Sequence, residues 1–328
     1  MRSLAANLLT LLVALGVIVV GAALWGQRQW TAPGPAEQSA LFEVPRGAGL
    51  DAIAEGLFEA GLIESPLVFR LGARYSGLAG RLRFGEYEVP AEASPRELAE
   101  LLASGRSVQY SVTVPEGLTS AEVVALLEDS PLLTGEIEAV PAEGSLAPET
   151  YSVQRGDARA EVMARMQALQ AEILAEVWES RDPDIPLDDP EEALVLASIV
   201  EKETGVSGER AQVAGVFHNR LRRGMRLQSD PTIIYGITEG EEPLGRPLTR
   251  ADIERRTDWN TYQIDGLPPT PIANPGREAI EAAVRPAETD YLYFVADGSG
   301  GHAFAETLEG HNRNVRAWRA IEAERRTP

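Results

Sequence analysis

The sequence predicts an α+β protein in three parts: an N-terminal transmembrane helix, a small α+β domain and a larger mixed α/β domain. Three observations support this prediction. An apolar run fills residues 4–25, a strand and helix pattern repeats between residues 44 and 127, and an apolar helix near residue 195 ends on two acids. We place a cytoplasmic start and anchor at 1–30, a linker at 31–39, and the two domains at 40–137 and 138–328.

Composition narrows the classes of function. The 328 residues suffice for two modest domains with cores, and 44% hydrophobic content fits a globular protein. With 30 basic and 50 acidic residues the net charge is -20, so we expect no nucleic-acid partner. The chain has no cysteine, which excludes disulfides, a thiol nucleophile and thiolate metal sites. Its three histidines show no metal-ligand spacing, and we expect neither metal nor cofactor.

The apolar run Leu4–Trp25 is close to the roughly 20 residues that cross a bilayer. It is an anchor or a signal peptide, for which Val20–Ala22 is a tolerable cleavage site. The run exceeds the apolar part of a usual signal, and Trp25 and Trp30 suit the far interface, so we favour the anchor. Arg2 sets a weak positive-inside bias, opposed by Arg28. We predict a single-pass protein of the cytoplasmic (inner) membrane with its body on the periplasmic or extracytoplasmic side.

An internal repeat organises the small domain. In each of three copies a Val-Pro pair is followed, nine and thirteen residues after the Val, by two apolar residues at helical spacing. Each copy reads as a short strand, a turn containing Gly or an acid, and a helix. The copies begin at Val44, Val89 and Val114. Such units resemble LysM-like modules, which bind glycan chains, and a simple α+β packing unit explains the pattern equally well.

The helix near residue 195 has clear ends. Asp189 can cap it, Pro190 suits its first position, and Gly205 is a natural stop. Residues 193–200 are apolar except for Ser198, which predicts a helix enclosed by protein.

Two acids follow this apolar stretch. Glu201 leaves the core at a buried helix end, where desolvation favours the protonated form that a general acid needs. Glu203 lies about 200° further round the helix, so the two acids should not share one environment. The alternative is that both simply solvate a helix end.

Further elements follow from the pattern. We expect helices over 158–179, 207–224 and 307–325, and a hairpin whose strands are 291–296 and 302–304 around a Gly-rich turn. The loops after residues 225 and 259 carry clustered polar side chains, which are placed for binding.

Collinear motifs across this half resemble the YceG-like endolytic murein transglycosylases. They are Ala197-Ser-Ile-Val-Glu-Lys-Glu203, Phe217-His-Asn-Arg-Leu221, Met225-Arg-Leu-Gln-Ser-Asp-Pro231, Asn260-Thr-Tyr262, Gly266-Leu-Pro-Pro269, Asn274-Pro-Gly276 and Tyr291-Leu-Tyr-Phe-Val-Ala-Asp-Gly298. The resemblance extends more weakly to the membrane helix and the LysM-like domain. It departs at Glu143–Tyr151, where Leu146 and Ala147 stand in place of aromatic residues.

The resemblance implies that residues 138–328 form a catalytic domain acting on peptidoglycan. The expected reaction cleaves the bond between N-acetylmuramic acid and N-acetylglucosamine without water and leaves 1,6-anhydro ends. It also implies penicillin-binding synthases as partners. An ordinary glycosidase needs two carboxylates. Here one acid suffices, because the muramic C6 hydroxyl attacks the anomeric carbon while a single Glu donates and then accepts a proton.

Glu201 matches the family's catalytic position, and Glu203 is a supporting partner and the alternative acid. Lys202, the sole lysine, reads as a solvated charge at the helix end. The predicted substrate-binding residues are Glu203, Gln228, Ser229, Asp230, Asn260, Tyr262, Asn274, Tyr293 and Phe294.

The roles of these binding residues are left open between substrate contact and structure. Residues 228–230 either orient the substrate or stabilise a turn. Asn260, Tyr262 and Asn274 are expected to line the cleft, and Tyr293 or Phe294 either stacks on a sugar or belongs to the core.

Two other functions compete with the lytic enzyme. One is a glycan-binding scaffold of the wall-synthesis machinery without catalysis. The other is a hydrolase of the lysozyme type, for which Asp230 is the best second acid.

Overall fold

The computed structural model describes the backbone of residues 2–326 and the side chains of residues 9–325. Residue 1 and residues 327–328, at the ends of the predicted anchor and catalytic domain, lie outside the described residues. The chain forms two compact units. Unit 1 comprises residues 1–111, 132–134 and 152–157, and unit 2 comprises residues 112–131, 135–151 and 158–328. The mixture of helices and small sheets agrees with the predicted α+β class.

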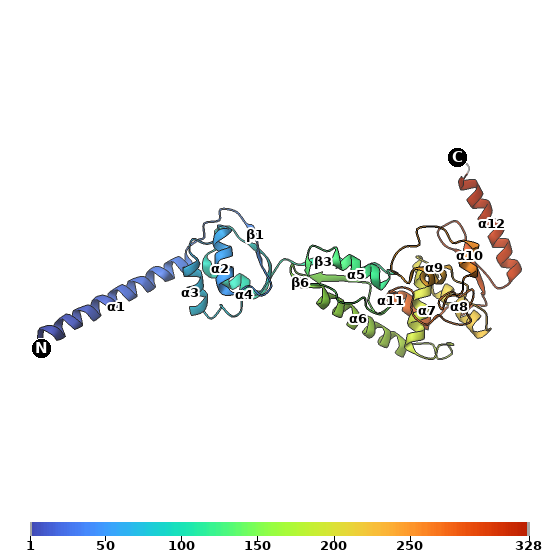
Figure 1. Ribbon diagram of the computed structural model, residues 1–328, viewed down its shortest axis with the longest axis horizontal. Helices are drawn as coiled ribbons and strands as arrows, with labels where there is room; N and C mark the ends of the chain where they lie inside the picture. Colours follow the sequence, from blue (N-terminus) through green and yellow to red (C-terminus); the bar gives the residue numbers. More distant parts are fainter. Residues whose placement is uncertain (1, 327–328) are drawn as a thin grey trace. The chain divides into compact units, whose positions relative to one another are not determined.

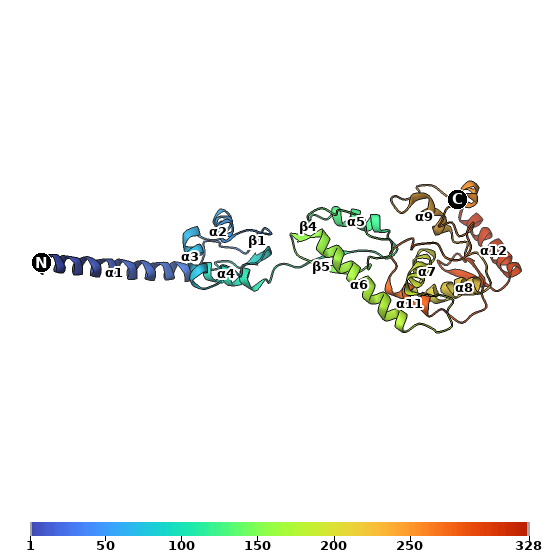
Figure 2. The ribbon, with the colours of Figure 1, turned by 60° about the horizontal axis from the view of Figure 1, so that its bottom comes forward.

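Unit 1 contains a two-stranded antiparallel sheet covered by short helices. Strand β1 pairs with β2 from Ala40↔Val89 to Val44↔Gly85. Phe69, Tyr87 and Leu102 are among the side chains that fill its core. Figure 1 and Figure 2 both show helix α3 beside the C-terminal end of α1, and the sheet on the opposite side of the unit. The elements are α1 (Arg2–Thr31), β1 (Ala40–Val44), α2 (Leu50–Glu59), α3 (Pro66–Tyr75), β2 (Gly85–Val89) and α4 (Pro95–Ser104).

The predicted strand and helix repeats are present. Helices α2, α4 and α5 (Ser120–Glu128) follow β1, β2 and β3 (Tyr110–Thr113), and the paired apolar positions of all three helices are buried. The third residue after each repeat's Val has a left-handed backbone: φ is 80° at Gly47, 56° at Glu92 and 77° at Gly117. The same turn therefore joins strand to helix three times, at Glu92 without the glycine that this conformation favours.

The third repeat differs from the predicted division at residue 137, because it belongs to unit 2. Backbone bonds explain this placement. Gly117 N donates to Asn274 O at 3.0 Å, and Asn274 N donates to Leu118 O at 2.8 Å. The turn before α5 is thus bonded to a loop more than a hundred residues later.

Helix α1 is the one described helix that is long and apolar enough to cross a membrane. Its candidate span covers Leu9–Thr31, with a mean hydropathy of 2.4, and no residue of its most apolar 18-residue stretch is buried by the rest of the chain. The predicted N-terminal apolar helix is therefore present.

Unit 2 is mainly helical. Helix α7 lies at its centre and packs against α6, α8, α9 and α11. Short sheets pair β3 with β5, β4 with β6, and β7 with β8. The remaining elements, of which β4 belongs to unit 1, are β4 (Leu133–Thr134), β5 (Thr150–Val153), β6 (Asp157–Ala158), α6 (Arg159–Glu179), α7 (Pro190–Glu203), the 3-10 turn η1 (Ser207–Glu209), α8 (Arg210–Arg222), α9 (Asp230–Thr238), α10 (Arg250–Glu254), α11 (Arg277–Val284), β7 (Tyr293–Ala296), β8 (His302–Ala305) and α12 (Leu308–Arg326).

The start of α7 forms as the sequence predicts, whereas Gly205 does not adopt the left-handed backbone of the predicted glycine stop. The Asp189 side chain accepts a hydrogen bond from Glu192 N at 2.9 Å, and Pro190 occupies the first turn. Ala193 and every residue from Val195 to Val200 are buried, including Ser198, whose hydroxyl donates to Val195 O. The helix ends at Glu203, where Thr204 turns to an extended backbone. This core helix therefore fixes where both acids emerge.

The repeated left-handed turn generates a stability prediction. A Cβ at Gly47 would meet no atom within 4 Å, so Gly47→Ala incurs only the conformational cost of about 1–2 kcal/mol. Glu92→Gly removes that cost, so it should leave stability unchanged or raise it. Hydrogen exchange of the buried amides of α2 and α4, measured by mass spectrometry, reports both effects. Equal destabilisation by the two substitutions would contradict the conclusion that Gly47 and Glu92 occupy the same left-handed turn.

Candidate active site

Glu201 is held by groups from two other helices. Arg210 Nη2, on the first turn of α8, donates to Glu201 Oε1 at 3.2 Å, and Gly276 N, at the start of α11, donates to Oε2 at 2.9 Å. The Glu201 side chain is only 5% exposed. Both Glu201 oxygens are thus occupied.

Arg210 binds two further carboxylates. Its Nη2 lies 2.9 Å from Glu116 Oε2, and its Nη1 lies 2.7 Å from Glu278 Oε2. Burial raises the pKa of Glu116, and the charge of Glu201 raises it further. Among the described residues, no group of three or more His, Cys, Asp or Glu side chains is arranged to hold a metal ion. The cluster therefore links α7, α8 and α11 through one guanidinium.

Glu203 lies in a different environment on the same helix. Its Oε1 accepts a hydrogen bond from Ser229 Oγ at 2.5 Å, and its Oε2 has no bonded partner in the described part of the chain. Glu203 is half-buried, as Glu201 is. Desolvation raises the pKa of the Glu203 carboxyl, and the charge of Asp230 raises it as well, while the Ser229 bond and Arg220 oppose the shift. As the helix geometry predicts, the two acids share no hydrogen-bond partner.

The loop that begins at Met225 brings the predicted polar residues to Glu203. Ser229 is buried, and its N–H donates to Thr261 Oγ1 at 3.0 Å. Asp230 is exposed and accepts from the Tyr262 hydroxyl at 2.7 Å. Burial and that bond raise the pKa of Tyr262. Gln228 is exposed with φ of 49°, a backbone conformation that non-glycine residues rarely adopt.

Asn260 and Asn274 do not line a cleft, contrary to expectation, because both are fully buried. The Asn260 amide donates to backbone carbonyls between residues 252 and 255, including Arg255 O at 2.6 Å. Asn274 Oδ1 accepts from Leu146 N at 2.9 Å, while its Nδ2 donates to Leu118 O at 3.0 Å. These side chains hold loops together and leave no polar group for a substrate.

The two aromatic residues of β7 point to opposite faces of the strand. Phe294 packs edge-on against Phe217, with ring centroids 5.9 Å apart, and lies half-buried against the core cluster. Its role as a sugar platform stays a prediction. Tyr293 stacks on His311 at 5.2 Å and lies beneath the Arg220 guanidinium at 5.5 Å. Tyr293 is thus on the face that carries Arg220, whose charge also reaches Glu203.

Arg220 is a functional candidate that the sequence did not single out. It is 7% exposed, and its Nε and Nη1 donate to Leu292 O at 2.7 Å and Leu227 O at 2.6 Å. Burial lowers its pKa. The available signal was the position of this arginine between Phe217 and Leu221 on the helix face that the sequence assigned to packing, where a charge needs buried partners. By contrast Lys202 is exposed, and its Nζ donates to Gly117 O at 3.0 Å.

The segment Glu143–Tyr151, which differs from the family pattern, also has structural roles. Leu146 and Ala147 are fully buried, so neither meets a substrate. Glu143 Oε1 accepts from Ser120 N at 2.8 Å, and burial raises the pKa of this carboxyl.

Comparison with known proteins decides the family. A family model described as the YceG-like family matches residues 42–317. The chain belongs to this family. A solved structure of a putative yceG-like protein from Listeria monocytogenes matches with a TM-score of 0.51 and 26% identity, covering 85% of this chain and 99% of that one.

Curated relatives bear an enzyme name. A protein of Bacillus subtilis (strain 168), named endolytic murein transglycosylase, is 30% identical over 301 residues, covering 82% of each chain. A Streptococcus pneumoniae protein (serotype 2, strain D39) of the same name is 28% identical over 321 residues, covering 83% of this chain and 57% of the relative. This YceG-like chain thus spans little more than half of the pneumococcal relative.

The buried amide of Asn274 generates a second prediction. Asn274→Ala leaves the Leu146 N–H without its partner, and an unsatisfied buried group costs about 1–3 kcal/mol. We expect a clear fall in melting temperature, measured by differential scanning calorimetry. Asn314 is the matched control, because its side chain makes one longer bond, to Phe304 O at 3.4 Å. An Asn274 variant as stable as the Asn314→Ala protein would contradict the structural role.

Proposed function

We propose that the chain is a membrane-anchored endolytic peptidoglycan lytic transglycosylase and that Glu203 is its general acid and base. Membership of the YceG-like family and the names of its relatives support the reaction class. The observation that carries the assignment is the contrast between the two acids of α7. Glu201 has both oxygens engaged by Arg210 and Gly276, whereas Glu203 accepts one hydrogen bond, from Ser229, and burial raises its pKa.

The chemistry needs one such group. Glu203 donates its proton to the glycosidic oxygen as the bond to the muramic anomeric carbon breaks. The muramic C6 hydroxyl then attacks that carbon, and Glu203 takes the hydroxyl proton, which restores the acid and leaves a 1,6-anhydro ring. A raised pKa favours the protonated form that the first step uses. Glu201, predicted from the motif to be the acid, is assigned instead to positioning the end of α7, because both of its oxygens are occupied by Arg210 and Gly276.

The other parts of the proposal concern location and substrate contact. Helix α1 is the anchor and places the body on the extracytoplasmic side, as the terminal charges suggest. Unit 1, with its strand, two helices and strand from β1 to β2, serves as the LysM-like glycan-binding module. Tyr262, Asp230 and Tyr293 are the proposed substrate contacts. A non-catalytic scaffold remains the second class and is separated from the enzyme by the next experiment.

Substitution of each acid tests the assignment. Glu203→Gln should lower the rate of anhydro-product release by ~10² or more, the usual contribution of a general acid. Glu201→Gln should reduce stability while product release continues, because Arg210 keeps Glu116 and Glu278. Mass spectrometry of digested peptidoglycan identifies anhydro ends as one water lighter than hydrolysed ends.

Other outcomes of this digestion have definite meanings. Reducing ends with water added would indicate hydrolysis, with Asp230 as the second acid. No cleavage by the wild-type chain would favour the scaffold. If the Glu203→Gln protein kept full activity and a folded Glu201→Gln protein lost its activity, Glu201 would be the general acid.

The pH dependence provides a separate prediction. Activity requires protonated Glu203, so it should fall as pH rises through the raised pKa of that group. Ser229→Ala removes a bond that lowers this pKa, so the alkaline limb of the kcat profile should move to higher pH. Asp230→Asn removes a charge that raises it, so the limb should move to lower pH. Shifts in the same direction for both variants would contradict this account.

A further inference from the structure

Helix α3 carries an exposed apolar stripe on a helix whose other face is buried. Leu67, Leu71 and Tyr75 recur every four residues and are 57%, 57% and 97% exposed. Val68 and Phe69 on the opposite side belong to the interior of unit 1. Three large side chains aligned along one helix form a contiguous apolar surface, which usually marks a contact site.

Close packing fixes α3 against the end of α1. A Cβ at Gly72 would lie 2.2 Å from the Trp30 ring, so only glycine allows this approach. Trp30 also meets Phe69, with ring centroids 6.0 Å apart. Both contacts lie within unit 1.

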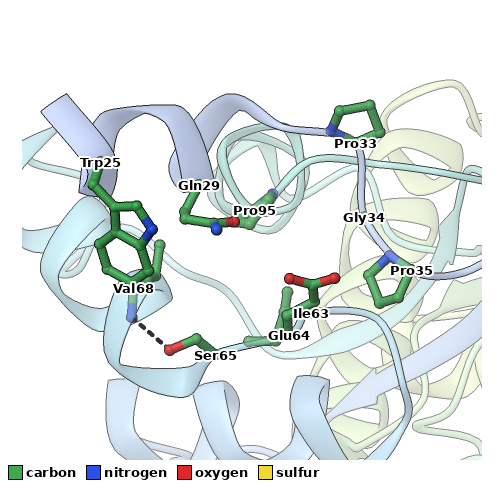
Figure 3. Close-up of a pocket in the computed structure, with 10 residues that line it drawn as sticks. All are labelled: Trp25, Gln29, Pro33, Gly34, Pro35, Ile63, Glu64, Ser65, Val68 and Pro95. Atoms are coloured by element: carbon green, nitrogen blue, oxygen red, sulfur yellow. Dashed lines mark hydrogen bonds between the residues drawn. The ribbon is translucent and has the colours of Figure 1, made fainter.

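The two helices also overlap along the length of α1. A cavity between them is lined by Trp25 and Gln29 of α1 and by Ser65 and Val68 of α3 (Figure 3). Trp25 precedes the end of the apolar span, Thr31, by six residues, or about 9 Å of helix. The first turn of α3 therefore flanks the last part of the span, which lies at the bilayer interface if α1 crosses the membrane.

We propose that the stripe formed by Leu67, Leu71 and Tyr75 docks into the interfacial layer of the same bilayer that α1 spans. Interfacial helices bury an apolar face about 5–10 Å into this layer, which matches the overlap with α1. The surface is continuous with α1, where Leu24 and Trp25 are 60% and 58% exposed.

Charge does not drive this docking. The chain carries a net charge of -20, and Arg70 on α3 is paired with Asp51 at 3.5 Å and Glu55 at 3.3 Å. Apolar insertion is the source of affinity, so a zwitterionic bilayer suffices as the partner. The inference rests on the anchoring role of α1 that forms part of the proposed function.

The absence of cysteine from the chain permits a direct test by single labelling. The full chain with Leu71→Cys, carrying an environment-sensitive fluorophore, is reconstituted in phosphatidylcholine vesicles with nitroxide on the lipid headgroup region. Two matched variants accompany it: Leu15→Cys inside α1, and Glu43→Cys on the exposed face of β1, on the side of unit 1 away from α1 (Figures 1 and 2).

We expect the Leu71 label to shift its emission to the blue and to lose more than half of its intensity to the nitroxide lipid, while the Glu43 label changes little. A Tyr75→Cys label should behave as Leu71 does, which guards against a local effect of one substitution. If the Leu15 label reports the bilayer interior but the Leu71 and Tyr75 labels are not quenched, the stripe does not dock into the bilayer. The stripe would then be a contact site for a protein partner. A Leu15 label that remains in water would overturn the anchoring role of α1 itself.

Discussion

The buried helix α7 is the constraint on which the candidate site depends. Its apolar residues fill the centre of unit 2, so the helix cannot rotate without exposing core, and its last turn must present Glu201 and Glu203 to different surroundings. Glu201 is bonded to Arg210 and Gly276, which ties the end of α7 to α8 and α11. A buried carboxylate without these donors would be costly, so the clamp is also a condition for the helix to end there.

Because Arg210 and Gly276 hold Glu201 in place, Glu203 needs fewer partners of its own. Glu201 and its partners fix the helix terminus, and the Ser229 bond sets the direction of Glu203, which leaves the second Glu203 oxygen for the chemistry that we propose. The loop carrying Ser229 and Asp230 is itself fixed through Thr261, next to the buried Asn260. The buried asparagines thus contribute to the site by holding the loops that carry the exposed polar groups.

Local signals predicted much of the fold. Asp189 and Pro190 specify the start of α7, the Val-Pro spacing specifies three strand and helix pairs, and the Gly-rich turn specifies the β7 and β8 hairpin. Local signals could not predict the different surroundings of Glu201 and Glu203. The partners that separate Glu201 from Glu203 are Arg210, Gly276 and Ser229, and the latter two lie far along the chain. Likewise, motif membership brought Asn274 close to the site without revealing its burial.

Opposing influences on Glu203 suit a group that must both donate and accept a proton. Burial and the Asp230 carboxylate raise the pKa of Glu203, whereas the Ser229 hydrogen bond and the charges of His302 and Arg220 lower it. Under the proposed function, one carboxyl with a raised pKa and a retained hydrogen bond serves both steps, so that reaction uses no second carboxylate of the kind hydrolases require.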